Sequence, residues 1–297
     1  MPLQPLPPLP QNLSMTLPTD SLKPLDAKRF DRTLKPTVFW RIGEDIPVGL
    51  KWGLMALSAI VPLTLWWIVS SLPGIESVFL PSPVEVGQAF VSLGRRGFLA
   101  TDTLASFGRV MGGFLLAAIV SAPLGIAMGT FASIRALTEP IIGIVRYMPA
   151  PAFVPLLIIY LGINEEPKIM LIFIGTVFFN TLMIMDAVKF VPKDLIETTY
   201  TLGGLRSQVV LQVIMPYIVP NIIDAFRVNM AASWNLVVVA ELVAAESGLG
   251  KRILIAQKFL KTEEIFACLI VLGIIGFAID LFFRLLLRLS CQWAIEE

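Results

Sequence analysis

The chain has 297 residues, of which 56% are apolar and 15% charged, with a mean hydropathy of +0.79 and a net charge of +1. A typical soluble domain carries roughly 25% charged residues, so this composition favours a chain dissolved in a lipid bilayer. The near-neutral charge argues against a nucleic-acid partner, and the absence of histidine excludes histidine-based metal sites and catalytic triads.

Residues 1–45 are predicted to form a proline-rich cytoplasmic tail, separate from a transmembrane domain over 46–297. Six prolines fall within the first 18 residues, and proline fixes φ and removes a backbone donor, so we expect an extended chain. Six basic residues between Lys23 and Arg41 precede the first long apolar segment and place the N-terminus in the cytoplasm. The tail is interpreted as a docking arm or, with more weight, as a disordered extension.

Six apolar segments follow, each close to the ~20 residues that cross about 30 Å of hydrocarbon. They are expected at 51–72, 103–129, 137–161, 168–186, 217–240 and 265–288. Six crossings return the C-terminus to the cytoplasm, and Arg284 and Arg288 near that end agree with this orientation. The predicted fold is therefore an all-α, six-helix transmembrane bundle.

Two smaller features lie outside this pattern. Pro81 and Pro83 precede a short amphipathic stretch that ends near Leu93, which predicts an interfacial helix between the first two segments. Cys268 and Cys291 lack CxxC spacing and are interpreted as small apolar residues in or beside a membrane helix. No metal site and no catalytic residue are predicted.

The longest polar connection, residues 187–216, is predicted to form a cytoplasmic knob of two short helices. Residues 192–194 (Pro-Lys-Asp) are typical of a helix start, and Gly203 and Gly204 end that helix before a second amphipathic one begins. A compact helical knob of this kind suits a groove on a soluble partner.

The spacing within this connection resembles the signature of ABC-importer permeases, which is Glu-Ala-Ala, three residues, Gly, nine residues, Ile, one residue and Leu-Pro. The corresponding positions of this chain are Glu197, Thr198, Thr199, Gly203, Val213, Met215 and Pro216. The glutamate, glycine and proline match the pattern, whereas two threonines replace the alanines and valine and methionine replace isoleucine and leucine. Four further stretches resemble the nitrate/sulfonate/taurine branch of these permeases. They are residues 80–83, 106–110, 155–158 with Gly162, and 240–242 with 248–250.

The resemblance covers roughly residues 50–290 and implies a permease subunit of the type I ABC importer fold. The solute it implies is a small anion such as nitrate, a sulfonate, taurine or bicarbonate. The implied partners are a second permease copy as a homodimer, two cytoplasmic ATPase subunits, an extracytoplasmic solute-binding protein and the lipid bilayer. The implied location is a bacterial-type inner membrane, spanned several times, with both termini cytoplasmic. The residues assigned to ATPase coupling are Glu197, Thr198, Thr199, Leu202, Gly203, Gly204 and Pro216.

The chain itself offers no convincing ATP-binding loop. Such a loop needs GxxxxGK[ST], and the nearest string is Gly250-Lys251-Arg252, in which Arg252 replaces the hydroxyl residue and Ala245 replaces the first glycine. The string is interpreted as an external turn. We therefore expect no cofactor in this chain, with ATP and Mg bound by the partner ATPases.

Side chains inside the apolar segments are candidates for the translocation path or a gate. They are Arg146, Met148, Asn180, Asp224, Arg227, Asn229, Trp234, Asn235 and Glu241. Helical periodicity predicts one polar side facing the pore or a second subunit, made of Asn221, Asp224, Arg227, Trp234, Asn235 and Glu241. Asp224 and Arg227 either neutralise each other or form a gate. Arg146 either attracts an anion or extends its charge to the membrane surface or to an ion pair. Asn180 is otherwise expected to make an interhelical hydrogen bond, and Met148 to pack within the bundle.

Two other classes are weighed. An ion- or proton-coupled secondary transporter is the main alternative, but such proteins usually carry paired repeats and broken helices in both halves, which this sequence does not display. An integral membrane enzyme would need a carboxylate or Ser-Lys site, and no such group of residues stands out.

Overall fold

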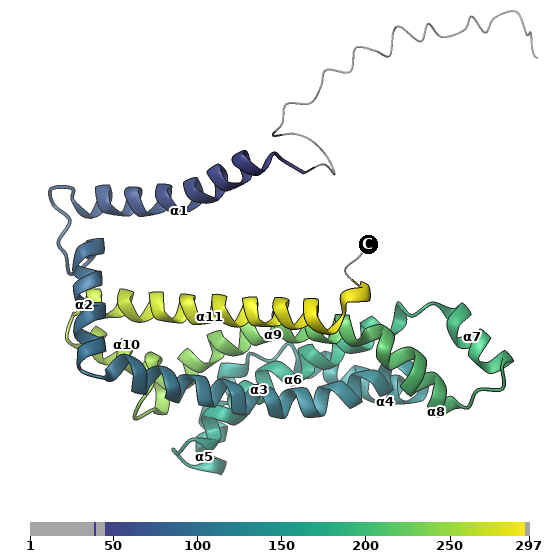
Figure 1. Cartoon of the computed structure of the whole chain (residues 1–297). Coiled ribbons are helices and arrows are strands. Elements are labelled where there is room, and N and C mark those ends of the chain that lie inside the picture. Colours follow the sequence, from purple (N-terminus) through teal and green to yellow (C-terminus); the bar gives the residue numbers. More distant parts are fainter. Residues whose placement is uncertain (1–38, 40–44, 295–297) are drawn as a thin grey trace, which may run out of the picture. The chain divides into compact units, whose positions relative to one another are not determined.

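The chain folds into long helices in this computed structural model, which describes Phe39 and residues 45–294 (Figure 1). The predicted tail lies almost wholly outside these residues. Every regular element within the described part is a helix. The structure divides inside α1 (Val48–Ser70), after Pro62, and every helix that follows α1 lies in the second unit.

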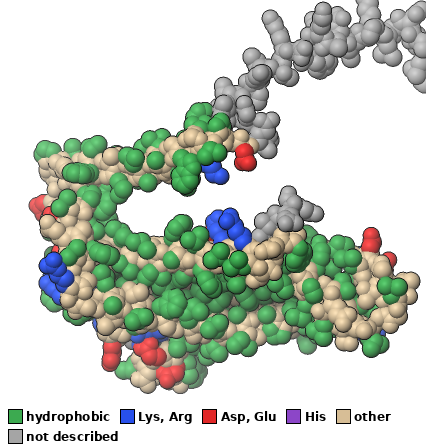
Figure 2. All heavy atoms as spheres, in the orientation of Figure 1, with side chains coloured by type: hydrophobic (Ala, Val, Ile, Leu, Met, Phe, Trp, Pro, Cys, Tyr) green, Lys and Arg blue, Asp and Glu red, His purple; other side chains and the backbone are tan. Residues whose placement is uncertain are grey.

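Five helices are long and apolar enough to cross a membrane, or six if one bent pair counts as a single span. The five are α1, α3 (Phe98–Thr130), α6 (Glu166–Lys189), the helix that runs over Arg206–Val243 and includes most of α9 (Met215–Ala244), and α11 (Thr262–Ser290). Each overlaps a predicted segment. Apolar side chains cover much of the visible face of these helices, as a surface in contact with lipid requires (Figure 2).

The predicted helix over 137–161 is broken rather than continuous. Its first part is α4 (Ala132–Val145), and its second part is a 3-10 turn (Ala150–Phe153) followed directly by α5 (Val154–Leu161). The two parts meet at 84°. The expectation of one continuous helix over 137–161 was wrong because the prolines at the break, beginning with Pro149, remove helical donors and force the preceding residue out of the helical region.

Helices α3 and α6 pack closely and run parallel. A Cβ built on Gly113 would lie 2.6 Å from Ile172, and one on Gly129 would lie 2.4 Å from Val188. The sequence separation of the two pairs is the same, so both helices run in one direction. Small residues recur along this face of α3 at every fourth position, at Gly113, Ala117, Ser121, Gly125 and Gly129. They allow the two backbones to approach closely, as small residues do between membrane helices.

The two ends of the bundle differ. Helices α2 (Pro83–Arg95) and α10 (Leu249–Lys258) lie at one end, hereafter the α10 end, and α7 (Lys193–Thr201) lies at the other, the α7 end (Figure 1). The predicted helix near Leu93 is confirmed as α2, which begins with a reciprocal cap between Ser82 and Glu85. The expected external turn at Gly250 to Arg252 is wrong, because these residues form the first turns of α10.

Candidate functional site

The predicted knob is present at the α7 end. Helix α7 ends in a left-handed Gly203, with φ at 82°, whose N–H donates to the Tyr200 carbonyl at 2.9 Å. The Gly204 N–H donates to the Thr199 carbonyl, also at 2.9 Å. These two bonds are the Schellman pattern that closes a helix with glycine, so the expected break after α7 is confirmed with its physical cause.

One side of helix α7 packs against the bundle, and the other side is exposed. None of its residues is buried, and Glu197 and Thr198 are exposed. Ile196 packs against a buried apolar cluster that includes Val209 and Ile214 of the following segment, while Leu202, just after α7, is 81% exposed. An exposed leucine beside an exposed carboxylate is suited to a partner's groove rather than to solvent.

A π-helical segment joins the knob to the bundle. After α8 (Arg206–Gln208), residues Val209–Ile214 form wide turns that lead directly into α9. Pro216 sits in the first turn of α9 and has no N–H to complete an α-helical turn, which accounts for the wider winding before it. The same segment packs against Ala187 and Val188 of α6, so α7 is connected to two membrane helices.

A cavity of about 430 Å³ lies at the break between α4 and α5. Its wall comes from the break itself and from facing parts of α6 and α9, including Gly175, Phe178 and Leu236. Three predicted path residues, Arg146, Met148 and Asn235, line it together. Sequence reasoning placed these side chains in two separate segments, and the fold brings them to one space.

Arg146 is the charged residue of this cavity. Its guanidinium donates to the Tyr147 hydroxyl at 3.0 Å and lies 4.8 Å from the centre of that ring. Among residues 45–294, no carboxylate pairs with it, and no other cavity-lining side chain is charged. An unpaired cation in a mostly apolar cavity attracts anions.

Asp224 and Arg227 lie nearer the α7 end of α9. Arg227 contacts Asp224 at 2.8 Å and a second carboxylate, Asp280 of α11, at 2.9 Å. The expected pair is confirmed, and α11 adds a partner that the sequence did not indicate. A gating role for the pair stays a prediction.

The remaining path candidates are buried in the bundle. They are Asn180, Asn229, Trp234 and Glu241. Trp234 donates its indole N–H to the Leu272 carbonyl at 3.0 Å, whereas Asn235 beside it is exposed. The prediction of one polar side along this helix was therefore wrong. Trp234 and Glu241 are buried, Asn235 lines the cavity, and Asp224 and Arg227 are partly exposed near the α7 end. Asn180 finds no hydrogen-bond partner among the described residues, so the expected interhelical bond is also wrong.

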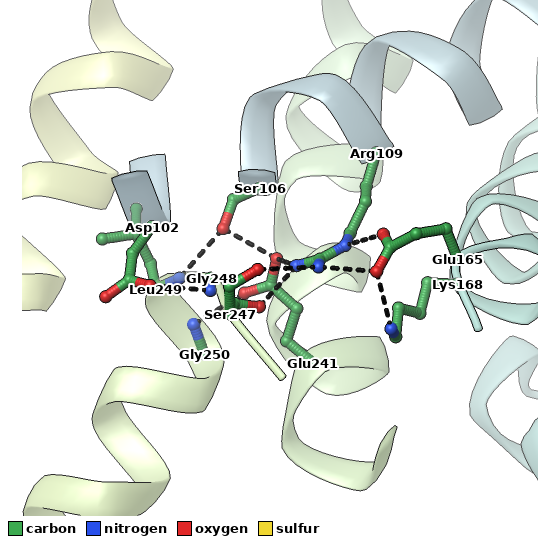
Figure 3. Close-up of polar contacts among 10 residues, drawn as sticks. All are labelled: Asp102, Ser106, Arg109, Glu165, Lys168, Glu241, Ser247, Gly248, Leu249 and Gly250. Atoms are coloured by element: carbon green, nitrogen blue, oxygen red, sulfur yellow. Dashed lines mark hydrogen bonds and ion pairs between the residues drawn. The ribbon is translucent and has the colours of Figure 1, made fainter. Parts of the chain in front are cut away.

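Glu241 belongs to a buried charge network near the α10 end (Figure 3). Its carboxylate accepts from Arg109 of α3 at 2.6 Å, from the Ser106 hydroxyl at 2.7 Å and from the Gly250 N–H at 2.7 Å. The side chain of Glu241 is 0% exposed and that of Arg109 is 4% exposed. A charge pair buried this deeply persists only when further hydrogen bonds satisfy both groups, and these contacts do so.

The turn before α10 is built around this carboxylate. A Cβ on Gly248, whose φ is 121°, would lie 2.4 Å from the Glu241 carboxyl carbon. The Leu249 N–H donates to Ser106, and the Gly248 N–H donates to Asp102, which also accepts from Arg252. Two stretches that resemble the permease family, 106–110 and 240–242 with 248–250, thus meet in one site.

Glu165 joins the network from the turn between α5 and α6. It accepts from Arg109 Nη2 at 2.9 Å and from Lys168 Nζ at 2.9 Å. Its side chain is 53% exposed, unlike its partners. The hydrogen bond from Arg109, with a smaller contribution from Lys168, lowers the pKa of Glu165 to about 2, although burial opposes this shift. The ion pairs are therefore present at neutral pH and are lost only as the pH falls through that value.

Sequence reasoning found Glu241 and missed its ion-pair partner Arg109. It also missed Asp102, Glu165 and Lys168, further charged residues of the network. Arg109 lies inside the predicted span 103–129, and an ionisable residue in a membrane helix is itself a signal of function or pairing. Glu165 and Lys168 gave no such signal, because they lie at the edge of a predicted span, where charges are ordinary.

The long apolar helices, the broken helix beside a cavity and the exposed knob define an integral membrane transport protein. The family described as "Binding-protein-dependent transport system inner membrane component" matches residues 121–293. The chain belongs to this family and is a permease subunit of an ABC importer.

Relatives that align over most of the chain are also transport permeases. The chain is 34% identical to the taurine transport system permease protein TauC of Escherichia coli K12, over 91% of this chain and 97% of TauC. It is 31% identical to the putative aliphatic sulfonates transport permease protein SsuC of Bacillus subtilis 168, over 82% and 88%. It is 28% identical to the bicarbonate transport system permease protein CmpB of Synechococcus elongatus, over 82% and 93%.

A solved structure shows the same fold. A chain of the MetNI methionine ABC transporter in an inward-facing conformation matches with a TM-score of 0.59 at 18% identity, over 66% of this chain and 97% of that one. The predicted importer fold is thereby confirmed, and the relatives support an importer permease rather than a secondary transporter.

Proposed function

We propose that two copies of this chain form the pathway for a small anion and that separate ATPase subunits, which bind ATP and Mg, drive it. An extracytoplasmic binding protein delivers the solute, the α7 end faces the cytoplasm and the α10 end faces outward. The cavity at the α4–α5 break, with its unpaired Arg146, carries the proposal. Relatives named for taurine, sulfonates and bicarbonate point to the same class of solute.

In this proposal α7 is the coupling helix. Closure of the ATPase pair moves α7 as a rigid body, and the apolar contacts of Ile196, Val209 and Ile214 carry that motion to α6 and α9. Thr198, Thr199 and Gly204 shape the knob, whereas Glu197 and Leu202 contact the ATPase.

Replacing Glu197 by lysine or Gly203 by aspartate is expected to uncouple the importer. The first change reverses an exposed charge at the proposed contact, and the second places a side chain at a left-handed position and adds a charge. In proteoliposomes with the cognate ATPase and binding protein, solute-stimulated ATP hydrolysis should fall at least about tenfold, a loss of roughly 1.4 kcal/mol of coupling.

Lys193→Glu is the matched control, because it changes an exposed charge at the other end of α7. Full coupling in both test variants would show that the 187–216 segment is only a connector.

Arg146→Gln is expected to raise the KM for the anion about tenfold, which corresponds to roughly 1.4 kcal/mol, while Arg146→Lys retains most of the affinity. The reason is that glutamine removes the cavity's charge and lysine keeps it. Uptake of labelled taurine, a sulfonate, bicarbonate and nitrate identifies the solute. Tyr147→Phe removes the hydroxyl bonded to Arg146 without changing charge and serves as control. An unchanged KM in Arg146→Gln, with every anion transported, would exclude this residue from the path.

A further inference from the structure

The cavity at the α4–α5 break contains a hydrogen-bond acceptor as well as a cation. Among the described residues that line it, those with polar side chains are Arg146, Tyr147 and Asn235, and the others are apolar residues or glycine. The Arg146 guanidinium only donates, and the Tyr147 hydroxyl already accepts a hydrogen bond from it. Asn235 is therefore the polar side chain of this wall that is not engaged with Arg146.

The orientation of the Asn235 amide is fixed by its own helix. Its Nδ2 donates to the Ala231 carbonyl, one turn earlier in α9, at 3.0 Å. A carbonyl oxygen only accepts, so the amide nitrogen faces Ala231 and the amide oxygen faces away from it. No donor in the described part of the chain bonds this Oδ1. Because Asn235 lies on the same face of α9 as the cavity-lining Ala232, Leu236 and Val239, its oxygen is available to a solute in the cavity.

An open amide oxygen is costly at this place in the chain. Asn235 lies within the apolar span over Arg206–Val243, and its side chain is exposed. Lipid supplies no hydrogen-bond donor, so polar side chains in membrane spans face a cavity or a partner. Leucine would fill the same position without an unpaired acceptor. The amide therefore suits a position whose partner is a molecule in the cavity.

We propose that the cavity binds an organic anion that also carries an N–H or O–H donor, with the anionic end at Arg146 and the donor at Asn235 Oδ1. This inference rests on the function proposed above and names the class of solute within it. Aminoalkyl and hydroxyalkyl sulfonates or carboxylates belong to the class, whereas nitrate has no donor and does not. The cavity volume of about 430 Å³ lies in the range of sites for small organic molecules. Arg146 attracts any anion, and Asn235 is the specificity-determining residue.

Three sulfonates of similar size test the class of solute. Taurine has an ammonium group, isethionate a hydroxyl group and propane-1-sulfonate a methyl group at the same end of the molecule. The reporter is Met148→Cys, which places a thiol in the cavity, whereas the native Cys268 and Cys291 are buried. The importer, purified with its cognate ATPase and without the binding protein, is treated with a maleimide while each sulfonate is titrated. Omitting the binding protein removes its own selectivity from the result.

Taurine and isethionate are expected to protect the thiol at concentrations about tenfold lower than propane-1-sulfonate, equivalent to roughly 1.4 kcal/mol. The reason is that the methyl group leaves Asn235 Oδ1 unpaired. Asn235→Leu should remove this difference. Asn235→Asp should widen the preference for taurine over propane-1-sulfonate, because a carboxylate attracts the ammonium group. Asn221→Leu is the matched control, since Asn221 is an exposed asparagine of α9 outside this cavity, and it should leave the preference unchanged.

Calorimetric titration of the importer that retains Met148 measures the same three affinities without the thiol. Equal or stronger binding of propane-1-sulfonate, or a preference for taurine that survives in Asn235→Leu, would overturn the solute class. If Arg146→Gln then weakens all three sulfonates alike, the anion pathway still stands. Failure of every sulfonate to bind, or binding that Arg146→Gln does not weaken, would reject the proposed function and the solute class with it.

Discussion

Replacing Arg109 by glutamine is expected to lower the free energy of unfolding by about 3–5 kcal/mol, because the Glu241 carboxylate then remains buried without a counter-charge. The hydrogen bonds from Ser106 and Gly250 remain, but neither supplies a positive charge. Thermal unfolding of the detergent-purified importer should show a midpoint roughly 10 °C lower. The unfolding midpoint of Arg109→Lys should lie between those of Arg109→Gln and the unchanged protein. Lysine keeps the positive charge but lacks the planar group that reaches several acceptors at once.

A double-mutant cycle separates the pair from general damage. Glu241→Gln in the Arg109→Gln background should cost much less than Glu241→Gln alone, because the buried charge that it removes is already unpaired. Additive costs would show that the two groups do not depend on each other. Arg135→Gln is a suitable comparison, since this arginine bonds only to backbone carbonyls in the described residues.

Local features of the fold were predictable from the sequence. The α7 cap depends on Gly203 and Gly204 and on the carbonyls within one turn before them, so a short stretch of sequence contains its cause. The spans depend on length and hydropathy, which are also local. The same holds for α2, whose start requires only Ser82, Pro83 and Glu85.

The site depended on contacts that periodicity cannot report. Arg109 and Glu241 meet across 132 residues, and the helical angle of Glu241 within its own segment gives no indication of which helix it faces. The cavity arises where Pro149 interrupts a span, and proline alone does not distinguish a kink from a full break. Parallel packing of α3 against α6 brings the charged residues into one layer, and this packing is tertiary information.

Replacing Gly125 by leucine is expected to destabilise the bundle by at least about 3 kcal/mol, at or above the upper end of ordinary overpacking costs. A Cβ at this position would lie 2.7 Å from the Thr181 carbonyl oxygen and 2.8 Å from Ile184, so α3 and α6 would have to separate. Separation costs van der Waals contact along the whole face and draws Arg109 on α3 away from the Glu165 carboxylate at the start of α6. Thermal unfolding and the yield of monodisperse complex measure the effect.

Gly108→Leu on the same helix is the control, because a Cβ there meets nothing within 4 Å. The higher helix propensity of leucine should make that change neutral or slightly stabilising. Equal losses in the two variants would show that bulk on α3, rather than its contact with α6, limits the fold.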